Sequence, residues 1–188
     1  MGRWEPNPRE RLKQAALELF AEQGFAATTV PQITARAGLT TRTFYRHFAD
    51  KREALFDHED ELPGLVASLV AEAPPGMTPM RIIERGLTET AQTRFEGRLA
   101  ELRTRQAVVQ SDEGLREREG RKFALLSDSL RQALVGRGVH ETTATIAAQL
   151  ATSVFAVAVG RWLEQPGERP LTEFITEALT AMRSLAAG

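Results

Sequence analysis

The stretch from Thr28 to Leu55, TTVPQITARAGLTTRTFYRHFADKREAL, constrains the fold of this chain more than any other stretch. Its helix start and stop signals predict two short helices and the beginning of a third, at 30–37, at 41–48 and from Lys51 onward. The first two helices are separated only by a turn at Gly38 and Leu39. Two helices joined by so short a turn form a helix-turn-helix, and the third would support it.

Capping residues stand where the helices should begin and end. Thr29 is followed three residues later by Gln32, and Asp50 by Glu53, which is the spacing of a capping box. Gly38 can adopt the left-handed conformation that ends a helix and reverses the chain. The boundaries of the motif are therefore specified locally.

The second helix of the motif has one apolar side and one side rich in hydrogen-bond donors. Phe44 and Phe48 lie four residues apart and should be buried together. The remaining side chains point away from them: Thr40, Thr41, Arg42, Thr43, Tyr45, Arg46 and His47. From 36 to 52 the chain carries five basic residues against one acid, a local charge of +4. Such a surface suits the phosphates and base edges of DNA.

The same residues resemble the DNA-binding domain of the tetracycline-repressor (TetR) family of bacterial transcription regulators. The shared run, from residue 28 to 55, is T-T-V-x-x-I-x-x-x-A-G-L-T-x-R-T-F-Y-R-H-F-x-x-K-x-x-L, and the resemblance covers about residues 9–56. One position departs from the pattern, because many relatives carry glycine where Arg42 stands. The operator of a relative therefore cannot be transferred to this chain.

The resemblance assigns roles to individual residues. Positions that mostly touch phosphates in TetR-like proteins are occupied here by Thr29, Tyr45, His47 and Lys51. Candidates for base edges are Thr40, Thr41, Arg42 and Arg46, with Thr43 a candidate for either role. The alternative for Thr40 and Thr43 is helix capping alone, and for Tyr45 it is a half-buried ring that packs the motif.

Composition bounds the rest of the chain. Its 188 residues, 42% of them hydrophobic, can bury one large core or two small ones, and the absence of cysteine excludes disulfides and thiolate sites. We find no apolar run approaching a membrane span and no secretory leader, which predicts a cytoplasmic protein without a membrane partner. Residues 1–56 carry nine basic and six acidic residues, and the remainder fifteen and nineteen. The basic end is the predicted DNA end, and Arg3 belongs either to a disordered arm or to one that enters the minor groove.

Beyond the motif only helical signals occur. We therefore predict an all-α fold with an N-terminal three-helix DNA-binding domain at 1–54 and a C-terminal helical domain at 55–188. The family resemblance implies that this second domain is the effector-binding and dimerisation domain. Pro63 and Gly64 should kink or split the helix that begins at Lys51. Further helices are expected at 78–95, 97–110, 111–136 with a Ser111 cap, 140–163 and 171–185. The charged run 117–122 should form a solvated face.

The last two helices, at about 141–164 and 171–186, are rich in small and apolar residues on most sides. A helix of this kind must be buried on most sides, either by a second copy of the chain or by the core of the monomer itself. Dimers through the last two helices are typical of TetR-like proteins. We therefore predict a homodimer, whose two recognition helices would bind a palindromic DNA operator.

The resemblance also implies a cavity for a small-molecule effector among the middle helices. The candidate lining residues, each of which is also a candidate for the ordinary core, are Phe95, Leu102, Phe123, Phe155 and Trp162. Nothing in the sequence identifies the effector.

No catalytic chemistry is assigned. The three histidines lie far apart, and no phosphate-binding loop, nucleophile elbow or paired-histidine motif occurs. The run from His58 to Glu61 could hold a metal but is typical of a polar helix face, so neither metal nor cofactor is predicted. We predict a homodimeric, ligand-responsive repressor. The alternatives are a small-molecule-binding helical protein, a carrier or a helical enzyme, with a weak or inactive DNA-binding head, and a transcriptional activator of the same fold.

Overall fold

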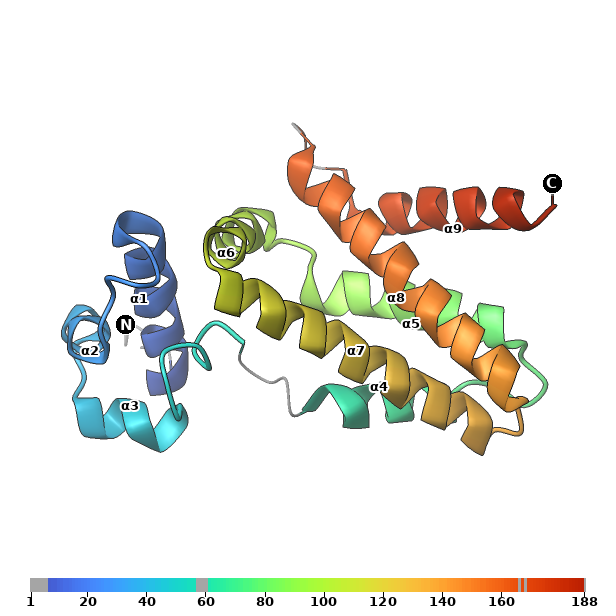
Figure 1. Ribbon diagram of the computed structural model, residues 1–188, viewed down its shortest axis with the longest axis horizontal. Coiled ribbons are helices and arrows are strands. Elements are labelled where there is room, and N and C mark those ends of the chain that lie inside the picture. The colour runs from blue at the N-terminus through green and yellow to red at the C-terminus, as the bar shows by residue number, and fades with distance from the viewer. Residues whose placement is uncertain (1–6, 57–60, 166, 168, 188) are drawn as a thin grey trace, which may run out of the picture. The chain divides into compact units, whose positions relative to one another are not determined.

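The computed structural model describes residues 7–56, 61–165, 167 and 169–187, and every regular element in these ranges is a helix (Figure 1). The helices are α1 (Pro8–Gln23), α2 (Val30–Ala37), α3 (Thr41–His47), α4 (Leu62–Ala71), α5 (Pro79–Arg94), α6 (Leu99–Ser111), α7 (Glu113–Gly136), α8 (Glu141–Glu164) and α9 (Leu171–Ala187). The predicted all-α fold class is confirmed. Arg3 and the run from His58 to Asp60 lie outside the described residues.

The prediction of a helix beginning at Lys51 was wrong. Residues 51–55 form consecutive turns, with Phe56 N bonded to the carbonyls of Arg52 and Glu53, both at 3.2 Å. The next described helix, α4, begins only at Leu62. Pro63 therefore occupies the first turn of α4, where its missing N–H costs no hydrogen bond, and does not kink a longer helix.

The predicted cap of α7 was also displaced by one residue. Asp112 Oδ1 accepts the Leu115 amide at 3.0 Å, so Asp112 caps the helix. Ser111 belongs to the last turn of α6, where its hydroxyl donates to Val108 O at 2.7 Å.

The contacts divide the chain into two compact units, whose limits differ from the predicted division at 54 and 55. Unit 1 comprises Met1–Glu59 and Arg103–Glu119, and unit 2 comprises Asp60–Leu102 and Gly120–Gly188. The residues that bring the α6–α7 corner into unit 1 are Val108, Val109 and Leu115, which are buried in one core with the side chains of α1, α2 and α3. Unit 1 is thus built from two separate stretches of the chain.

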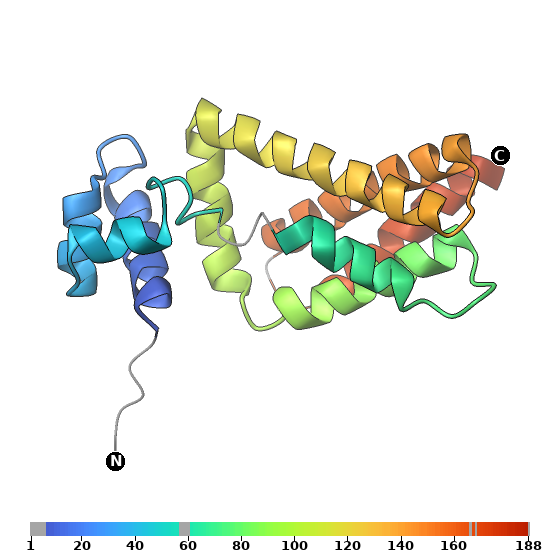
Figure 2. The same ribbon diagram turned by 90° about the horizontal axis from the view of Figure 1, so that it is seen from below.

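Unit 2 contains two apolar clusters, and α5 and α8 contribute side chains to both. Figure 2 draws the backbones of these helices within unit 2. In one cluster α5 and α8 pack with α9, and in the other they pack with α4 and the end of α7. Judged by length and composition alone, α8 is long and apolar enough to cross a membrane. Among the described residues it is the only helix of which this is true. The expectation that no segment approaches a membrane span does not hold for the length and composition of α8. Its buried residues nevertheless enter both clusters, as those of a core helix do.

Candidate nucleic-acid interface

The turn between α2 and α3 has the geometry that the glycine at its centre predicts. Gly38 is left-handed, with φ of 64°, and its amide bonds to Ala35 O at 3.1 Å. The Leu39 amide then bonds to Thr34 O at 2.8 Å, which closes the end of α2. A side chain at Gly38 would be strained by the backbone and would also meet the Arg11 guanidinium at 3.1 Å.

Helix α3 buries one side and exposes the other, as predicted. Phe44 and Phe48 are 0% and 1% exposed in the core of unit 1, and their ring centroids lie 5.4 Å apart. Opposite to them, Thr41, Arg42, Tyr45 and Arg46 are exposed. Tyr45 is 61% exposed and meets Phe44 only edge to face, so the alternative of a half-buried packing ring does not describe it.

Most cations of unit 1 are engaged within the protein. Lys13 pairs with Glu10 on α1, Arg11 donates to Ala37 O at 2.7 Å, and the Arg9 guanidinium lies 5.3 Å from the Phe48 ring. By contrast, Arg42 and Arg46 make no hydrogen bond, ion pair or ring contact with any described residue. Their ten N–H groups are available to a partner outside the chain.

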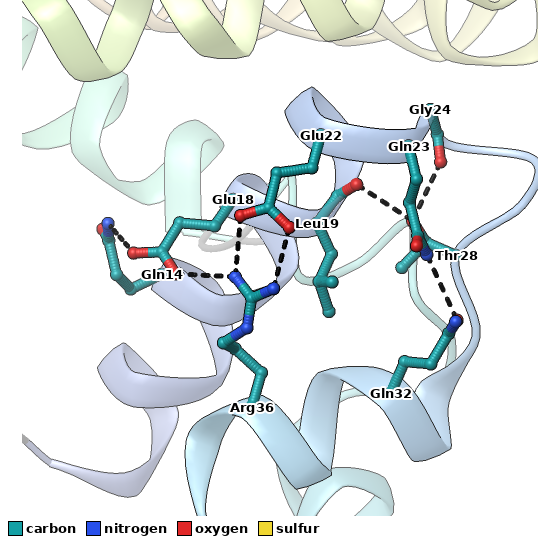
Figure 3. A network of polar contacts seen from close by, with 9 residues as sticks. All are labelled: Gln14, Glu18, Leu19, Glu22, Gln23, Gly24, Thr28, Gln32 and Arg36. Carbon is teal, nitrogen blue, oxygen red and sulfur yellow. Dashed lines mark hydrogen bonds and ion pairs between the residues drawn. The ribbon is translucent and has the colours of Figure 1, made fainter.

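Arg36 was counted as one of the five basic residues between 36 and 52, but in the structure its charge is paired. Its guanidinium forms a two-pronged pair with Glu22 on α1, at 2.9 and 2.7 Å, and also reaches Glu18 at 3.3 Å (Figure 3). These hydrogen bonds raise the pKa of Arg36, the pair with Glu22 most strongly. The local charge of +4 therefore overstates what DNA would meet, because two carboxylates of α1 face this cation.

The threonines of the motif serve the helix ends. Thr40 Oγ1 accepts the Thr43 amide at 3.2 Å, and the two hydroxyls lie 3.0 Å apart. At the start of α2 the predicted capping box is present, with the amide and the hydroxyl of Thr29 donating to Gln32 Oε1 at 2.8 and 2.9 Å. The capping roles are therefore present in the structure, while contacts of these exposed hydroxyls with DNA stay a prediction.

His47 and Lys51 are partly buried, as Thr43 is, and each has a nitrogen atom that faces the protein. The His47 Nε2 is shielded from solvent and has no hydrogen-bond partner among the described residues. The Lys51 ammonium donates inward, to the carbonyls of Phe25, Ala26 and Thr28. The phosphate contacts predicted for these two side chains stay predictions, and Lys51 is considered further below.

The aromatic candidates for an effector site gather in one of the clusters of unit 2. Phe95 meets Phe155 edge to face at 5.4 Å and Trp162 at 6.2 Å, and Leu102 packs against the same cluster. The Trp162 indole N–H donates to Arg169 O at 3.1 Å. Phe123 is half-buried on α7 and joins neither cluster of unit 2.

An open groove of about 420 Å³, which was not predicted from the sequence, lies along α5. Its lining residues are Met77, Arg81, Glu84, Arg85, Thr88, Glu89 and Gln92. The recurrence of polar side chains at 81, 85, 88 and 92 is the helical spacing that could have indicated this face. No group of three or more metal-ligating side chains occurs in the part of the chain that the structure describes.

Comparison with known proteins finds a family model that matches the N-terminal part of the chain. Residues 12–58 match the model of a family described as bacterial regulatory proteins, tetR family. The transcriptional regulator TcmR of Streptomyces glaucescens is 36% identical over 73 residues, which are 39% of this chain and 32% of TcmR. The chain thus spans about a third or less of the length of the first curated relatives it matches.

Solved structures resemble nearly the whole chain. NalD, the secondary repressor of the MexAB-OprM multidrug efflux pump in Pseudomonas aeruginosa, has a TM-score of 0.67 at 19% identity, over 94% of this chain and 95% of its own. A complex of SmeT with triclosan has a TM-score of 0.64 at 22% identity, over 93% and 90%. SmeT is the repressor of the Stenotrophomonas maltophilia multidrug efflux pump SmeDEF. At these identities the likeness shows the fold alone.

Proposed function

Because residues 12–58 match the model of the tetR family of bacterial regulatory proteins, we propose that this chain is a homodimeric transcriptional repressor. It would bind a palindromic operator and be released by a small-molecule effector. One observation carries the proposal: the exposed side of α3 holds two arginines, Arg42 and Arg46, whose guanidinium groups have no partner among the described residues. A buried arginine without a partner would destabilise the fold, but an exposed arginine without a partner does not. On a recognition helix, such an exposed guanidinium can bind a phosphate or a guanine base. Such a protein acts on DNA in the cytoplasm.

The arrangement of α2 and α3 supports a defined division of contacts. Arg42 and Arg46 lie four residues apart on one side of α3, so both can enter the major groove, where a bidentate arginine discriminates guanine by about 1–3 kcal/mol. Thr41 shares that side, and Tyr45 offers an exposed phenol to the adjacent phosphates. Thr29, at the start of α2, offers a hydroxyl and the positive end of a helix dipole.

The dimer is supported by an uncharged exposed side of α8. Ile146 is 53% exposed, Leu150 38% and Val157 55%, and the exposed residues between them are glutamine, serine and alanine. On α9 the exposed positions after Glu177 include Thr180, Ala181, Ser184 and Leu185, and the one exposed charge in that stretch, Arg183, pairs with Glu84 at 2.9 Å. Apolar surface of this extent favours a second copy, which would also bring two recognition helices to one operator.

The effector site is supported by the aromatic cluster around Phe95, Phe155 and Trp162. Edge-to-face rings and the apolar side chains beside them suit a small, largely apolar molecule. The structural relatives NalD and SmeT are named as repressors of multidrug efflux pumps, and SmeT was solved with triclosan. We extend that chemistry to this chain as a proposal only.

The test begins with a pool of random duplex DNA, from which the purified protein at physiological salt selects what it binds. The expected result is a palindromic site, with a dimer found by light scattering. Arg46→Ala should then lose the preference at one position of each half-site, a change of about 1–3 kcal/mol in discrimination. Arg36→Ala is the matched control, because that cation is already paired with carboxylates and should leave the selected sequence unchanged.

Two outcomes would contradict the proposal. An unchanged preference in both Arg42→Ala and Arg46→Ala would remove α3 as the recognition helix. If a folded dimer enriches no sequence, the aromatic cluster of unit 2 favours the second candidate function, a small-molecule-binding protein with an inactive head.

A further inference from the structure

The side chain of Lys51 turns inward from the end of the motif toward the loop between α1 and α2. Its ammonium donates to Phe25 O at 2.7 Å, to Thr28 O at 2.7 Å and to Ala26 O at 3.3 Å. An ammonium group has three N–H donors and no more. Each of them is therefore directed at a backbone carbonyl of one loop, and none is left for a phosphate.

The surroundings of Lys51, which is partly buried, hold its ammonium against the loop. Its Nζ lies 4.4 Å from the centre of the Phe25 ring, a cation–π contact that holds the ammonium over the same loop. Burial lowers the pKa of Lys51 below its ordinary 10.5, and the charge of Arg52 acts in the same direction. The adjacent Arg52 is exposed, and its nearest ring contact, with Phe25, is longer at 5.9 Å.

The loop that Lys51 holds leads directly into α2. Thr28 is 1% exposed, and its hydroxyl lies 2.8 Å from Gly24 O and 3.2 Å from Leu19 O (Figure 3). The next residue, Thr29, begins α2. At the opposite end of α2, Arg11 donates to Ala37 O at 2.7 Å, beside the turn into α3. At both ends of α2, backbone carbonyls thus accept hydrogen bonds from a cationic side chain that lies elsewhere in unit 1.

We propose that Lys51 is a positioning residue for DNA recognition, which fixes the α1–α2 loop and the start of α2 through three carbonyls, and is not itself a phosphate ligand. The inference deepens the proposed function and rests on it. The physical reason is the shape of the group: three converging carbonyls match a compact ammonium and do not match a planar guanidinium. Without the ammonium, Phe25 O would keep only the Thr28 amide as a donor, at 3.3 Å, and the carbonyls of Ala26 and Thr28 would lose the donor that Lys51 supplies.

The charge-conserving variant Lys51→Arg separates the two roles. If Lys51 bound a phosphate, arginine could replace it, but arginine cannot donate to the clamp of three converging carbonyls as an ammonium does. We therefore expect Lys51→Arg to weaken operator binding about tenfold at every salt concentration. Lys51→Met should weaken binding similarly, with the dependence of log K on log salt unchanged. A lost phosphate contact would instead flatten that slope by about 0.9 in each protomer. Arg52→Met is the matched control, because it removes the adjacent exposed charge without touching the loop carbonyls.

A second measurement does not depend on DNA. Amide hydrogen exchange in residues 25–30 should rise about tenfold or more in Lys51→Met and Lys51→Arg, and should stay at the wild-type rate in Arg52→Met. Circular dichroism checks that α1 and α3 remain folded in each variant. If the wild-type protein binds no DNA, the proposed function fails while this exchange measurement still tests the clamp.

The inference is overturned if exchange in 25–30 is the same in wild type and Lys51→Met. It is equally overturned if Lys51→Arg binds the operator like wild type while Lys51→Met flattens the salt slope. The first result would remove the clamp, and the second would return Lys51 to the set of phosphate ligands.

Discussion

Replacing Arg105 with alanine should destabilise unit 1 far more than an ordinary surface substitution would. Arg105 lies on α6, and its guanidinium forms a two-pronged pair with Glu119 of α7, at 2.8 and 3.3 Å. Its Nε donates to Leu55 O at 3.2 Å, and the group lies 5.0 Å from the centre of the Phe56 ring. One side chain therefore ties the α6–α7 corner to the segment that follows α3.

The magnitude follows from burial. The side chains of Arg105 and Glu119 are 19% and 18% exposed, so their pair is screened less than a surface pair. Hydrogen bonds to a charged group contribute about 1.5–3 kcal/mol. The ring contact adds about 0.5–2 kcal/mol. Because these contributions share one group they do not add fully, and we expect Arg105→Ala to lower the free energy of unfolding by about 3 kcal/mol.

Urea unfolding followed by circular dichroism measures the effect, and Arg98→Ala is the matched control. Arg98 directly precedes the same helix and forms the same kind of pair with Glu101, but there the side chains are 45% and 41% exposed. An exposed pair contributes about 0.2–1 kcal/mol. A double-mutant cycle with Glu119→Ala should give a coupling free energy of about 1–3 kcal/mol. The reasoning is refuted if Arg105→Ala costs no more than Arg98→Ala, or if the coupling is zero.

Two further predictions concern the contacts around α1. The hydrogen bond from Arg36 lowers the pKa of Glu22 below its ordinary 4.5 in the folded protein. The unfolded chain therefore binds this proton more tightly than the folded protein does. The contribution of the pair to the free energy of unfolding is present above the ordinary pKa and is lost as pH falls through the lowered pKa. Glu22→Gln should therefore flatten the dependence of the urea midpoint on pH between about pH 3 and pH 6. Thr28→Val should cost about 1–3 kcal/mol in urea unfolding, because it leaves Gly24 O without its donor, and Thr28→Ser should recover most of that loss. An equal loss in the serine variant would contradict the assigned hydrogen bond.

The helices of the head could be predicted closely because their signals are local. The left-handed Gly38 and the capping box at Thr29 act within one turn of chain, and α2 has the bounds that they predict. Asp50 also accepts the Glu53 amide at 2.9 Å, as the capping pattern requires. That cap nevertheless begins only a series of turns up to Phe56, because a capping pattern specifies a start and not a length.

The exposed character of Arg42, Tyr45 and Arg46 likewise followed from the sequence, since burying Phe44 and Phe48 on one side of α3 leaves these three on the other. What the sequence by itself determined was most of the helices, the one expected to begin at Lys51 excepted, and the apolar side of α3. Those properties depend on residues at most one or two turns apart.

Only the tertiary structure decided the partners of the charged side chains. Glu119 was predicted to belong to a solvated face, yet it is partly buried against Arg105. The charge of Arg36 was predicted to be free, yet it is paired with Glu18 and Glu22. Lys51 donates to a carbonyl 26 positions away along the chain. A long flexible cation pairs with whichever carboxylate or unpaired carbonyl the packed helices bring within its reach, and that depends on packing between distant segments, which no local pattern encodes.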